Sequence, residues 1–128
     1  MGILDRTSSA MKVVIVIEDE PLIRELIVEL LTFENYTVLQ AGHAKEALEI
    51  LATHAPGIAL MFTDIHMPGG MNGLQLAHHV RGRWPWIALL IASGNARPLA
   101  TEMPPLCRFM AKPYNHTMML DHVQQLCC

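Results

Sequence analysis

Val13-Val14-Ile15-Val16-Ile17 decides the fold, because a continuous run of β-branched residues is typical of a strand that is buried on both faces. Glu18-Asp19-Glu20 follows this run, and then Pro21, which the first turn of a helix tolerates. Apolar residues recur at three- and four-residue spacing from Leu22 to Leu31, as they do in an amphipathic helix. This stretch therefore predicts a buried strand followed by a helix that packs on the sheet.

The same alternation of strand and helix patterns continues along the rest of the chain. Further strands are predicted at 37–41, 58–63, 86–92 and 107–111, and helices at 44–54, about 74–83 and 116–126. The connection 95–106 contains three prolines, so it has room for only a turn or two of helix. Five such units predict an α/β fold with a doubly wound parallel sheet, because right-handed crossovers place helices on both of its faces.

Composition and charge exclude several classes of protein. The chain has 128 residues, of which 52% are hydrophobic and 16% are charged, so it is one folded domain and not a disordered tail. Its net charge of −3 argues against direct binding of nucleic acid. No apolar run approaches the ~20 residues that cross a membrane. The three cysteines form no CxxC motif, which favours a reduced, cytoplasmic setting, and Cys127 and Cys128 are expected to be frayed terminal thiols.

Polar and charged residues follow four of the predicted strands at the point where each strand ends. They are Glu18 and Asp19 after the first strand, Asp64 after the third, Ser93 after the fourth and Lys112 after the fifth. The carboxyl ends of parallel strands meet at one edge of the sheet, where ligands bind. Neighbouring carboxylates repel one another unless a cation lies between them, and an all-oxygen site suits Mg²⁺. An ammonium, a hydroxyl and a nucleophilic aspartate beside this ion favour phosphoryl transfer.

Taken together, these residues resemble the receiver domain of two-component response regulators. The motifs that carry the resemblance are Glu18-Asp19-Glu20, Asp64 with Ile65-His66-Met67-Pro68, Gly70-Met71-Asn72-Gly73, Ser93-Gly94 and Lys112-Pro113. The resemblance covers residues 12–126, nearly the whole chain. It implies a flavodoxin-like fold with five parallel strands in the order 2-1-3-4-5. It also implies a receiver domain over 12–127, preceded by a short leader over 1–11.

The resemblance assigns the acidic residues to a phosphorylation site. Asp64 is implied to be the phosphoacceptor, which takes a phosphoryl group from a histidine kinase or a histidine phosphotransfer protein. Mg²⁺ is the implied cofactor. Asp19 and Asp64 would bind it directly, Glu18 through a water molecule, and His66 through its backbone carbonyl. The implied role is that of a signalling phosphoacceptor and not of an enzyme that acts on other substrates.

The remaining motif residues would bind the phosphoryl group and respond to it. Ser93 and Lys112 match the residues that approach the phosphoryl group, and Phe109 matches the rotating aromatic of the switch. The bond between Lys112 and Pro113 is cis in relatives. The output surface of the family comprises the segment matching 97–106, the fifth strand and the last helix. The prolines leave little helix in this segment, and that departs from the family pattern.

Two positions at the mouth of the pocket and two alternative functions stay open. His66 and Asn95 match positions that affect the lifetime of the phosphoryl group in the family. The first alternative function is a Mg²⁺-dependent phosphohydrolase with an aspartate nucleophile, which usually carries a second aspartate two residues later, where this chain has His66. The second is a pseudo-receiver, a pure binding module, which would lack an intact pocket. The sequence does not identify the kinase, the downstream target or a further domain.

Overall fold

The computed structural model describes residues 12–95 and 97–127, so the expected leader over 1–11 lies outside the described residues. One parallel sheet contains all five strands in the order β2-β1-β3-β4-β5, which confirms the predicted flavodoxin-like fold. The strands are β1 (Val13–Ile17), β2 (Thr37–Ala41), β3 (Ile58–Asp64), β4 (Ala88–Ser93) and β5 (Cys107–Ala111).

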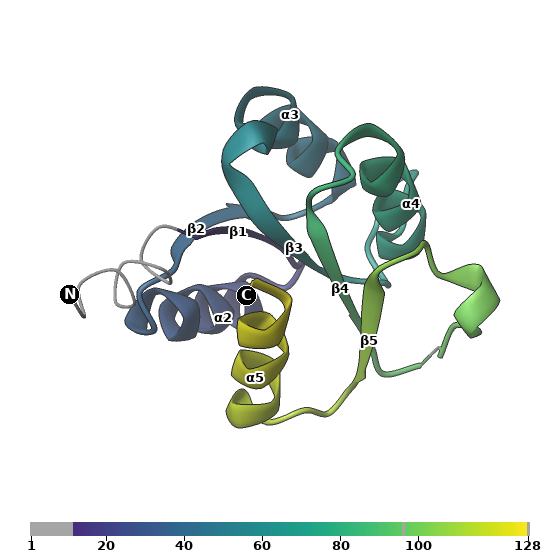
Figure 1. Ribbon diagram of the computed structural model, residues 1–128. Helices are drawn as coiled ribbons and strands as arrows, with labels where there is room; N and C mark the ends of the chain where they lie inside the picture. The colour runs from purple at the N-terminus through teal and green to yellow at the C-terminus, as the bar shows by residue number, and fades with distance from the viewer. Residues whose placement is uncertain (1–11, 96, 128) are drawn as a thin grey trace.

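Helices cover both faces of the sheet (Figure 1). Helices α2 (Pro21–Phe33) and α5 (His116–Cys127) lie on one face, and α3 (Ala44–His54) and α4 (Gly73–Arg83) lie on the other. Side chains of β1 alternate between the two cores, with Val14 and Val16 packed toward α2 and α5 and Ile15 and Ile17 packed toward α3 and α4. Both faces of β1 are thus buried, as its β-branched run predicted. None of the helices in the described part of the chain has the length and apolar character needed to span a membrane.

The connection between β4 and β5 has little helix, as its prolines predicted. Within the described residues, a single 3-10 turn, η2 (Ala100–Glu102), is the helical element between the two strands. The carboxylate of Glu102 accepts a hydrogen bond from the amide of Leu99 at 2.7 Å. The backbone carbonyl of Glu102 lies 2.6 Å from Nε2 of His78 on α4. The first contact closes the short turn, and the second ties it to α4.

Strand β4 begins at Ala88, two residues later than the sequence pattern predicted. The residues before it make hydrogen bonds outside the strand ladder, and the amide of Ile87 donates to the carbonyl of Trp84 at 3.1 Å. The indole of Trp86 donates a hydrogen bond to the carbonyl of Ala55 at 3.0 Å. The guanidinium of Arg81 donates hydrogen bonds of 2.8–3.1 Å to four carbonyls, those of Pro85, Ile87, Pro105 and Leu106. Arg81 therefore fixes where β4 and β5 start.

The terminal cysteines were expected to be frayed, and for Cys127 this expectation was wrong. Cys127 is buried in the core beneath α5, together with Met119 and Val123. These three residues are spaced four apart, so they share the helix face that is turned toward the sheet. Cys128 lies outside the described residues.

Candidate functional site

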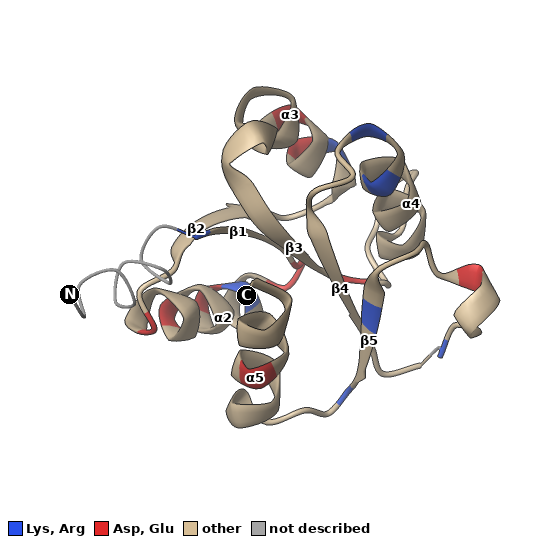
Figure 2. Ribbon diagram, viewed as in Figure 1, with Lys and Arg blue, Asp and Glu red and all other residues tan. Residues whose placement is uncertain are grey.

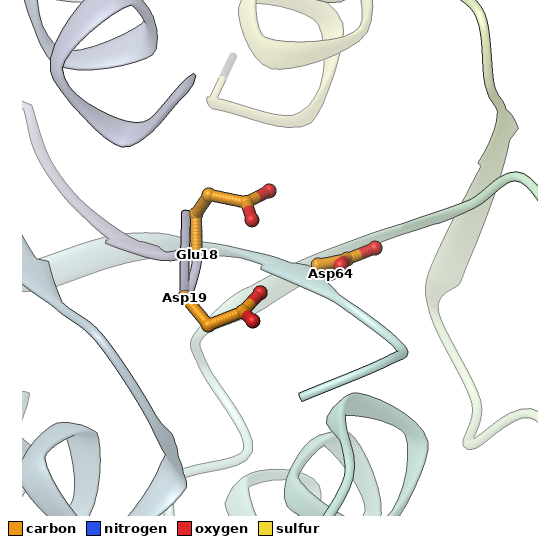
Figure 3. Close-up of side chains that lie close together, drawn as sticks. All are labelled: Glu18, Asp19 and Asp64. Atoms are coloured by element: carbon orange, nitrogen blue, oxygen red, sulfur yellow. The ribbon is translucent and has the colours of Figure 1, made fainter. Parts of the chain in front are cut away.

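Three carboxylates meet at the carboxyl edge of the sheet. Ile17 of β1 pairs with Thr63 of β3, so the next residues, Glu18 and Asp64, lie side by side at this edge. One oxygen from each of Glu18, Asp19 and Asp64 lies within 4.8 Å of the others. Figure 2 marks acidic residues in red where β1 and β3 end, and Figure 3 shows the side chains of Glu18 and Asp19 extending toward Asp64. The strand order alone places these groups together.

The ammonium of Lys112 reaches this acidic cluster from β5. Its Nζ lies 3.2 Å from Oδ1 of Asp64 and 3.7 Å from Oε1 of Glu18. The amide of Lys112 donates a hydrogen bond of 3.0 Å to the carbonyl of Ser93, which anchors the residue to the end of β4. The following bond to Pro113 is cis, the isomer that the resemblance implies. One ammonium faces three carboxylates, so negative charge remains in excess when all four groups are ionised.

Burial makes this excess of negative charge costly. Glu18 is 4% exposed and Asp64 is 8% exposed. Burial raises the pKa of Glu18, and the nearby charge of Asp64 acts in the same direction. The backbone amide of Glu20, which donates to Glu18 Oε2 at 3.1 Å, and the Lys112 ammonium both lower this pKa. The raising effect prevails, so the pocket favours an added cation.

The donor set fits a hard divalent cation. Oδ1 of Asp64 is buried and accepts no well-aligned hydrogen bond from the described residues, although it lies in the ion pair with Lys112. A buried oxygen of this kind is normally satisfied by a donor, a water molecule or an ion. Asp19 is exposed, so the site has an open side. Carboxylate oxygens with room for water are what Mg²⁺ prefers.

The two residues expected at the mouth of the pocket are both exposed. His66 and Asp19 line a hollow of about 310 Å³ on the open side of the carboxylate cluster. Asn95 follows β4, and its backbone amide donates a hydrogen bond to Oγ of Ser93 at 3.3 Å. Ser93 itself is buried at the end of β4. The structure therefore places a histidine beside the acidic cluster and an asparagine beside the serine.

Phe109 lies half-buried in β5, where it pairs with Ile91 of β4. The guanidinium carbon of Arg97 lies 5.2 Å from the centre of its ring, within cation–π distance. The sequence analysis matched Phe109 to the aromatic of the switch but missed Arg97. A lone arginine in a proline-containing loop belongs to no motif that would indicate such a contact. The contact links the loop after Ser93 to the side chain that would report phosphorylation.

Helix α4 begins in direct contact with the backbone of Asp64. The amide of Gly73 donates to the carbonyl of Ile65 at 2.8 Å. Asn72 and Gln75 form a capping box that starts the helix at this position. A Cβ atom at Gly73 would lie 2.0 Å from the carbonyl oxygen of Asp64, so only glycine permits this approach. The start of α4 thereby holds Asp64 in place.

Comparison with known proteins decides the family. The family model for the response regulator receiver domain matches residues 14–124. The chain belongs to this family. The receiver is 39% identical over 85 residues to the transcriptional regulatory protein AruR of Pseudomonas aeruginosa, covering 64% of this chain and 34% of AruR. It is 27% identical over 113 residues to the response regulator protein FleR of the same organism, covering 86% of this chain and 23% of FleR. The receiver thus spans about a third or less of these relatives.

Solved structures of receivers superpose on nearly the whole chain. The receiver domain from the hybrid histidine kinase CckA is 28% identical, with a TM-score of 0.79, over 91% of this chain and 99% of that one. The response regulator TrrA from Thermotoga maritima, solved in complex with Mg²⁺ and BeF, is 27% identical with a TM-score of 0.76. Its coverage is also 91% of this chain and 99% of that chain. The fold described above is therefore that of a receiver domain.

Tyr114 is a further residue of the receiver's pocket that sequence reasoning missed. Its ring centre lies 6.2 Å from that of Phe62, and it lines a cavity of about 10 Å³ with Glu18, Asp64 and Lys112 among other residues. Burial raises the pKa of Tyr114 to about 12, and the charges of Glu18 and Asp64 raise it too. In the sequence, a tyrosine after Lys112-Pro113 looks like an ordinary residue of the hydrophobic core, so nothing marks it as part of the pocket.

This shift predicts a loss of stability at alkaline pH. The ordinary pKa of the phenol is 10.0 and its folded value is about 12, so between these values the folded protein keeps a proton that the unfolded chain releases. The free energy of unfolding therefore falls as pH rises through this window. Tyr114→Phe removes this contribution, and we expect its free energy of unfolding to fall less steeply than that of the wild type. Urea denaturation at several pH values measures both slopes, and equal slopes would disprove the assignment.

Proposed function

We propose that this receiver accepts a phosphoryl group on Asp64 from a histidine kinase or a histidine phosphotransfer protein. The observation that carries the proposal is the cluster of three carboxylates within 4.8 Å, with the Lys112 ammonium 3.2 Å from Asp64. An aspartate in such a place is a nucleophile whose surroundings neutralise the charge of a phosphoryl group. The chain acts as a signalling module, and its substrate is its own side chain.

Mg²⁺ is the proposed cofactor of this reaction. Asp19 and Asp64 would hold it directly, Glu18 through water, and the backbone carbonyl of His66 would complete the protein ligands. When bound, Mg²⁺ neutralises negative charge on the oxygens of the transferring phosphoryl group. The buried Oδ1 of Asp64, which lacks a well-aligned hydrogen bond from the described residues, supports this assignment.

Asp64, Lys112 and Ser93 have separate tasks in the transfer. A carboxylate oxygen of Asp64 forms a bond to phosphorus while the bond from phosphorus to the donor histidine nitrogen breaks. The electron pair of that broken bond returns to the imidazole, which then takes a proton from solvent. The ammonium of Lys112 faces one phosphoryl oxygen, and the Ser93 hydroxyl donates a hydrogen bond to another.

The response to phosphorylation is a shift between two populations. The phosphorylated side chain carries nearly two negative charges and several acceptor oxygens where the carboxylate carried one charge, which attracts Lys112 and Ser93. Movement of Ser93 displaces the loop that carries Arg97, whose guanidinium lies over the ring of Phe109. Phosphorylation then favours the inward position of this ring and changes the surface formed by 97–106, β5 and α5.

The exposed start of α2 supports a protein donor. Leu22 is 76% exposed, Ile23 is 43% exposed and Leu26 is 46% exposed, all within two turns of the acidic loop. Leu26 and Ile23 also line a groove of about 210 Å³ between α2 and α5, which Lys112 reaches. Apolar side chains gathered in this way mark interaction surfaces. We therefore propose that the histidine-bearing partner docks on the start of α2.

Docking on α2 predicts a selective defect. We expect Leu22→Ser with Leu26→Ser to slow transfer from a histidine kinase by about tenfold, because the apolar contact with the partner is lost. Labelling by a small phosphodonor should stay at the wild-type rate. Phe33→Ser is the control, since Phe33 is 83% exposed at the far end of the same helix. If the double variant receives phosphate from the kinase as fast as the wild type, the partner docks elsewhere.

Metal binding predicts a second selective defect. Asp19→Asn should weaken Mg²⁺ binding by at least about tenfold, because even changes to groups that merely support a metal ligand have effects of this size. Isothermal titration calorimetry measures the dissociation constant directly. Glu25→Gln is the matched control, since Glu25 is an exposed carboxylate of α2 outside the carboxylate cluster. An unchanged dissociation constant for Asp19→Asn would remove Asp19 from the metal site.

A phosphodonor assay separates signalling from the two alternative functions. We expect one phosphoryl group per chain from a small phosphodonor, dependent on Mg²⁺ and labile in hydroxylamine. Multiple turnover of small phosphomonoesters would favour a phosphohydrolase. Failure of the wild type both to bind Mg²⁺ and to take up phosphate would favour a pseudo-receiver.

A further inference from the structure

We propose that Arg24 is a positioning residue for the metal-binding loop 18–20, and that it sets the affinity for Mg²⁺ without touching the ion. This inference rests on the proposed function. Arg24 lies half-buried in α2, one turn after the acidic loop. Its Nη1 donates a hydrogen bond of 2.7 Å to the backbone carbonyl of Glu18. Its Nε donates a second bond of 3.1 Å to Oε1 of Gln40 on β2.

The end of β2 fixes the guanidinium from its other side. A Cβ atom at Gly42 would lie 3.3 Å from Nη1 of Arg24, so the backbone there packs closely against the guanidinium. The amide of Gly42 is itself held by Oε1 of Glu46 at 2.7 Å. Gln40 and Gly42 thus restrict the positions that the guanidinium of Arg24 can take. Its position is set by the junction of β2 and α3.

The loop is consequently held on both sides of Glu18, at the peptide unit before this residue and at the one after it. The amide of Glu18 donates to the carbonyl of Ala41 at 3.1 Å, and the carbonyl of Glu18 accepts the bond from Arg24. That carbonyl belongs to the peptide plane shared with Asp19, so its orientation decides where the Asp19 carboxylate points. Without the guanidinium, this plane can rotate and Asp19 can leave the cluster. A bond from a charged donor is stronger than a neutral one, which suits this task.

The planar shape of the Arg24 guanidinium matters for this positioning as well as its charge. One planar guanidinium serves the Glu18 carbonyl and Gln40 at once. The single ammonium of a lysine is a point charge on a flexible stem and does not reproduce this two-point geometry. Arg24→Lys should therefore recover only part of the function, and this distinguishes positioning from a general effect of positive charge.

The test compares Mg²⁺ binding by Arg24→Met, Arg24→Lys and Arg83→Met. Arg83 is the matched control, because it is an exposed arginine at the end of α4 that packs on Trp84. We expect Arg24→Met to raise the dissociation constant for Mg²⁺ by about tenfold, as for other residues that orient metal ligands. Arg24→Lys should lie between this variant and the wild type, and Arg83→Met should match the wild type.

A second readout separates positioning from a loss of structure. At saturating Mg²⁺, labelling of folded Arg24→Met by a small phosphodonor should return to within about twofold of the wild-type rate, because the ligands themselves are intact. Gln40→Ala removes only one of the two anchors and should weaken Mg²⁺ binding by about threefold. This variant keeps the test decisive if Arg24→Met does not fold.

Two results would overturn the inference. One is wild-type Mg²⁺ affinity in folded Arg24→Met or in Gln40→Ala. The other is a labelling rate of Arg24→Met that stays low at saturating Mg²⁺, since Arg24 would then act on the reaction itself. In both cases the wild type still binds Mg²⁺, so the proposed function stands. A wild type that binds no Mg²⁺ would instead overturn the proposed function together with this inference.

Discussion

We expect Asp64→Asn to abolish uptake of phosphate from a small phosphodonor in the presence of Mg²⁺. An amide is not a nucleophile toward phosphorus, and it supplies one neutral oxygen where the cluster presents a carboxylate 3.2 Å from Lys112. The substitution hardly changes the size of the side chain, so the fold should be retained. Intact-mass spectrometry after incubation with the donor measures the fraction of labelled chain.

Asp121→Asn is the matched control for this experiment. Asp121 lies exposed on α5, where it accepts a hydrogen bond of 3.0 Å from Gln125. We expect this variant to take up phosphate as the wild type does, because Asp121 is outside the carboxylate cluster. Full labelling of Asp64→Asn would show that another residue accepts the phosphoryl group.

The second large effect is expected at Gly73, where a single methyl group would collide with the backbone of Asp64. The Cβ of alanine would lie 2.0 Å from the carbonyl oxygen of Asp64 and 2.9 Å from Cα of Ile65. Neither atom can yield unless α4 moves away from β3. We expect Gly73→Ala to lower the free energy of unfolding by about 3 kcal/mol, the upper part of the range for overpacking. Urea denaturation measures this change.

Gly82 offers a control on the same helix. Nothing lies within 4 Å of a Cβ placed at Gly82, and the residue is exposed in the last turns of α4. Because alanine is the better helix former, Gly82→Ala should raise the free energy of unfolding by about 0.5–1 kcal/mol. The two identical substitutions thus have opposite signs. Equal changes for both would show that helix propensity, and not the contact with Asp64, decides the effect at Gly73.

Most of the fold could be predicted because each strand carries its own signal. The run Val13–Ile17 is apolar on both faces, which only a central strand of a helix-covered sheet requires. Once the sheet is parallel, its strand ends share one edge, so the convergence of Glu18, Asp64 and Lys112 follows from chain order. These residues could be named as candidates without coordinates, although their roles rest on the family resemblance and stay predictions.

The sequence could not predict the contacts that long side chains of one helix make with other strands and loops. Arg24 and Arg81 look like solvated residues of amphipathic helices, because their spacing shows only that they are not in the core. The hydrogen bonds of Arg24 to Glu18 and of Arg81 to four loop carbonyls depend on how helices pack against strand ends. The spacing of apolar residues contains no such information. For the same reason, the sequence pattern predicted a start of β4 two residues too early.

The segment between β4 and β5 combines both kinds of information. Its prolines predicted the loss of regular helix, and η2 is the short turn that remains. The contact of Arg97 with Phe109 could not be predicted, since it needs the loop to fold back over β5. Leu99 and Leu106 are 66% and 80% exposed in this segment, so the surface that would change on phosphorylation carries apolar side chains.

The most direct test of the phosphorylation site is a crystal structure of this receiver with Mg²⁺ and beryllofluoride, a stable mimic of the phosphoryl group. The geometry predicts the mimic on the carboxylate of Asp64, with Mg²⁺ bound by Asp19 and Asp64 and the ammonium of Lys112 turned to a fluorine. A mimic bound away from Asp64, or a magnesium ion that does not touch Asp19, would contradict the account.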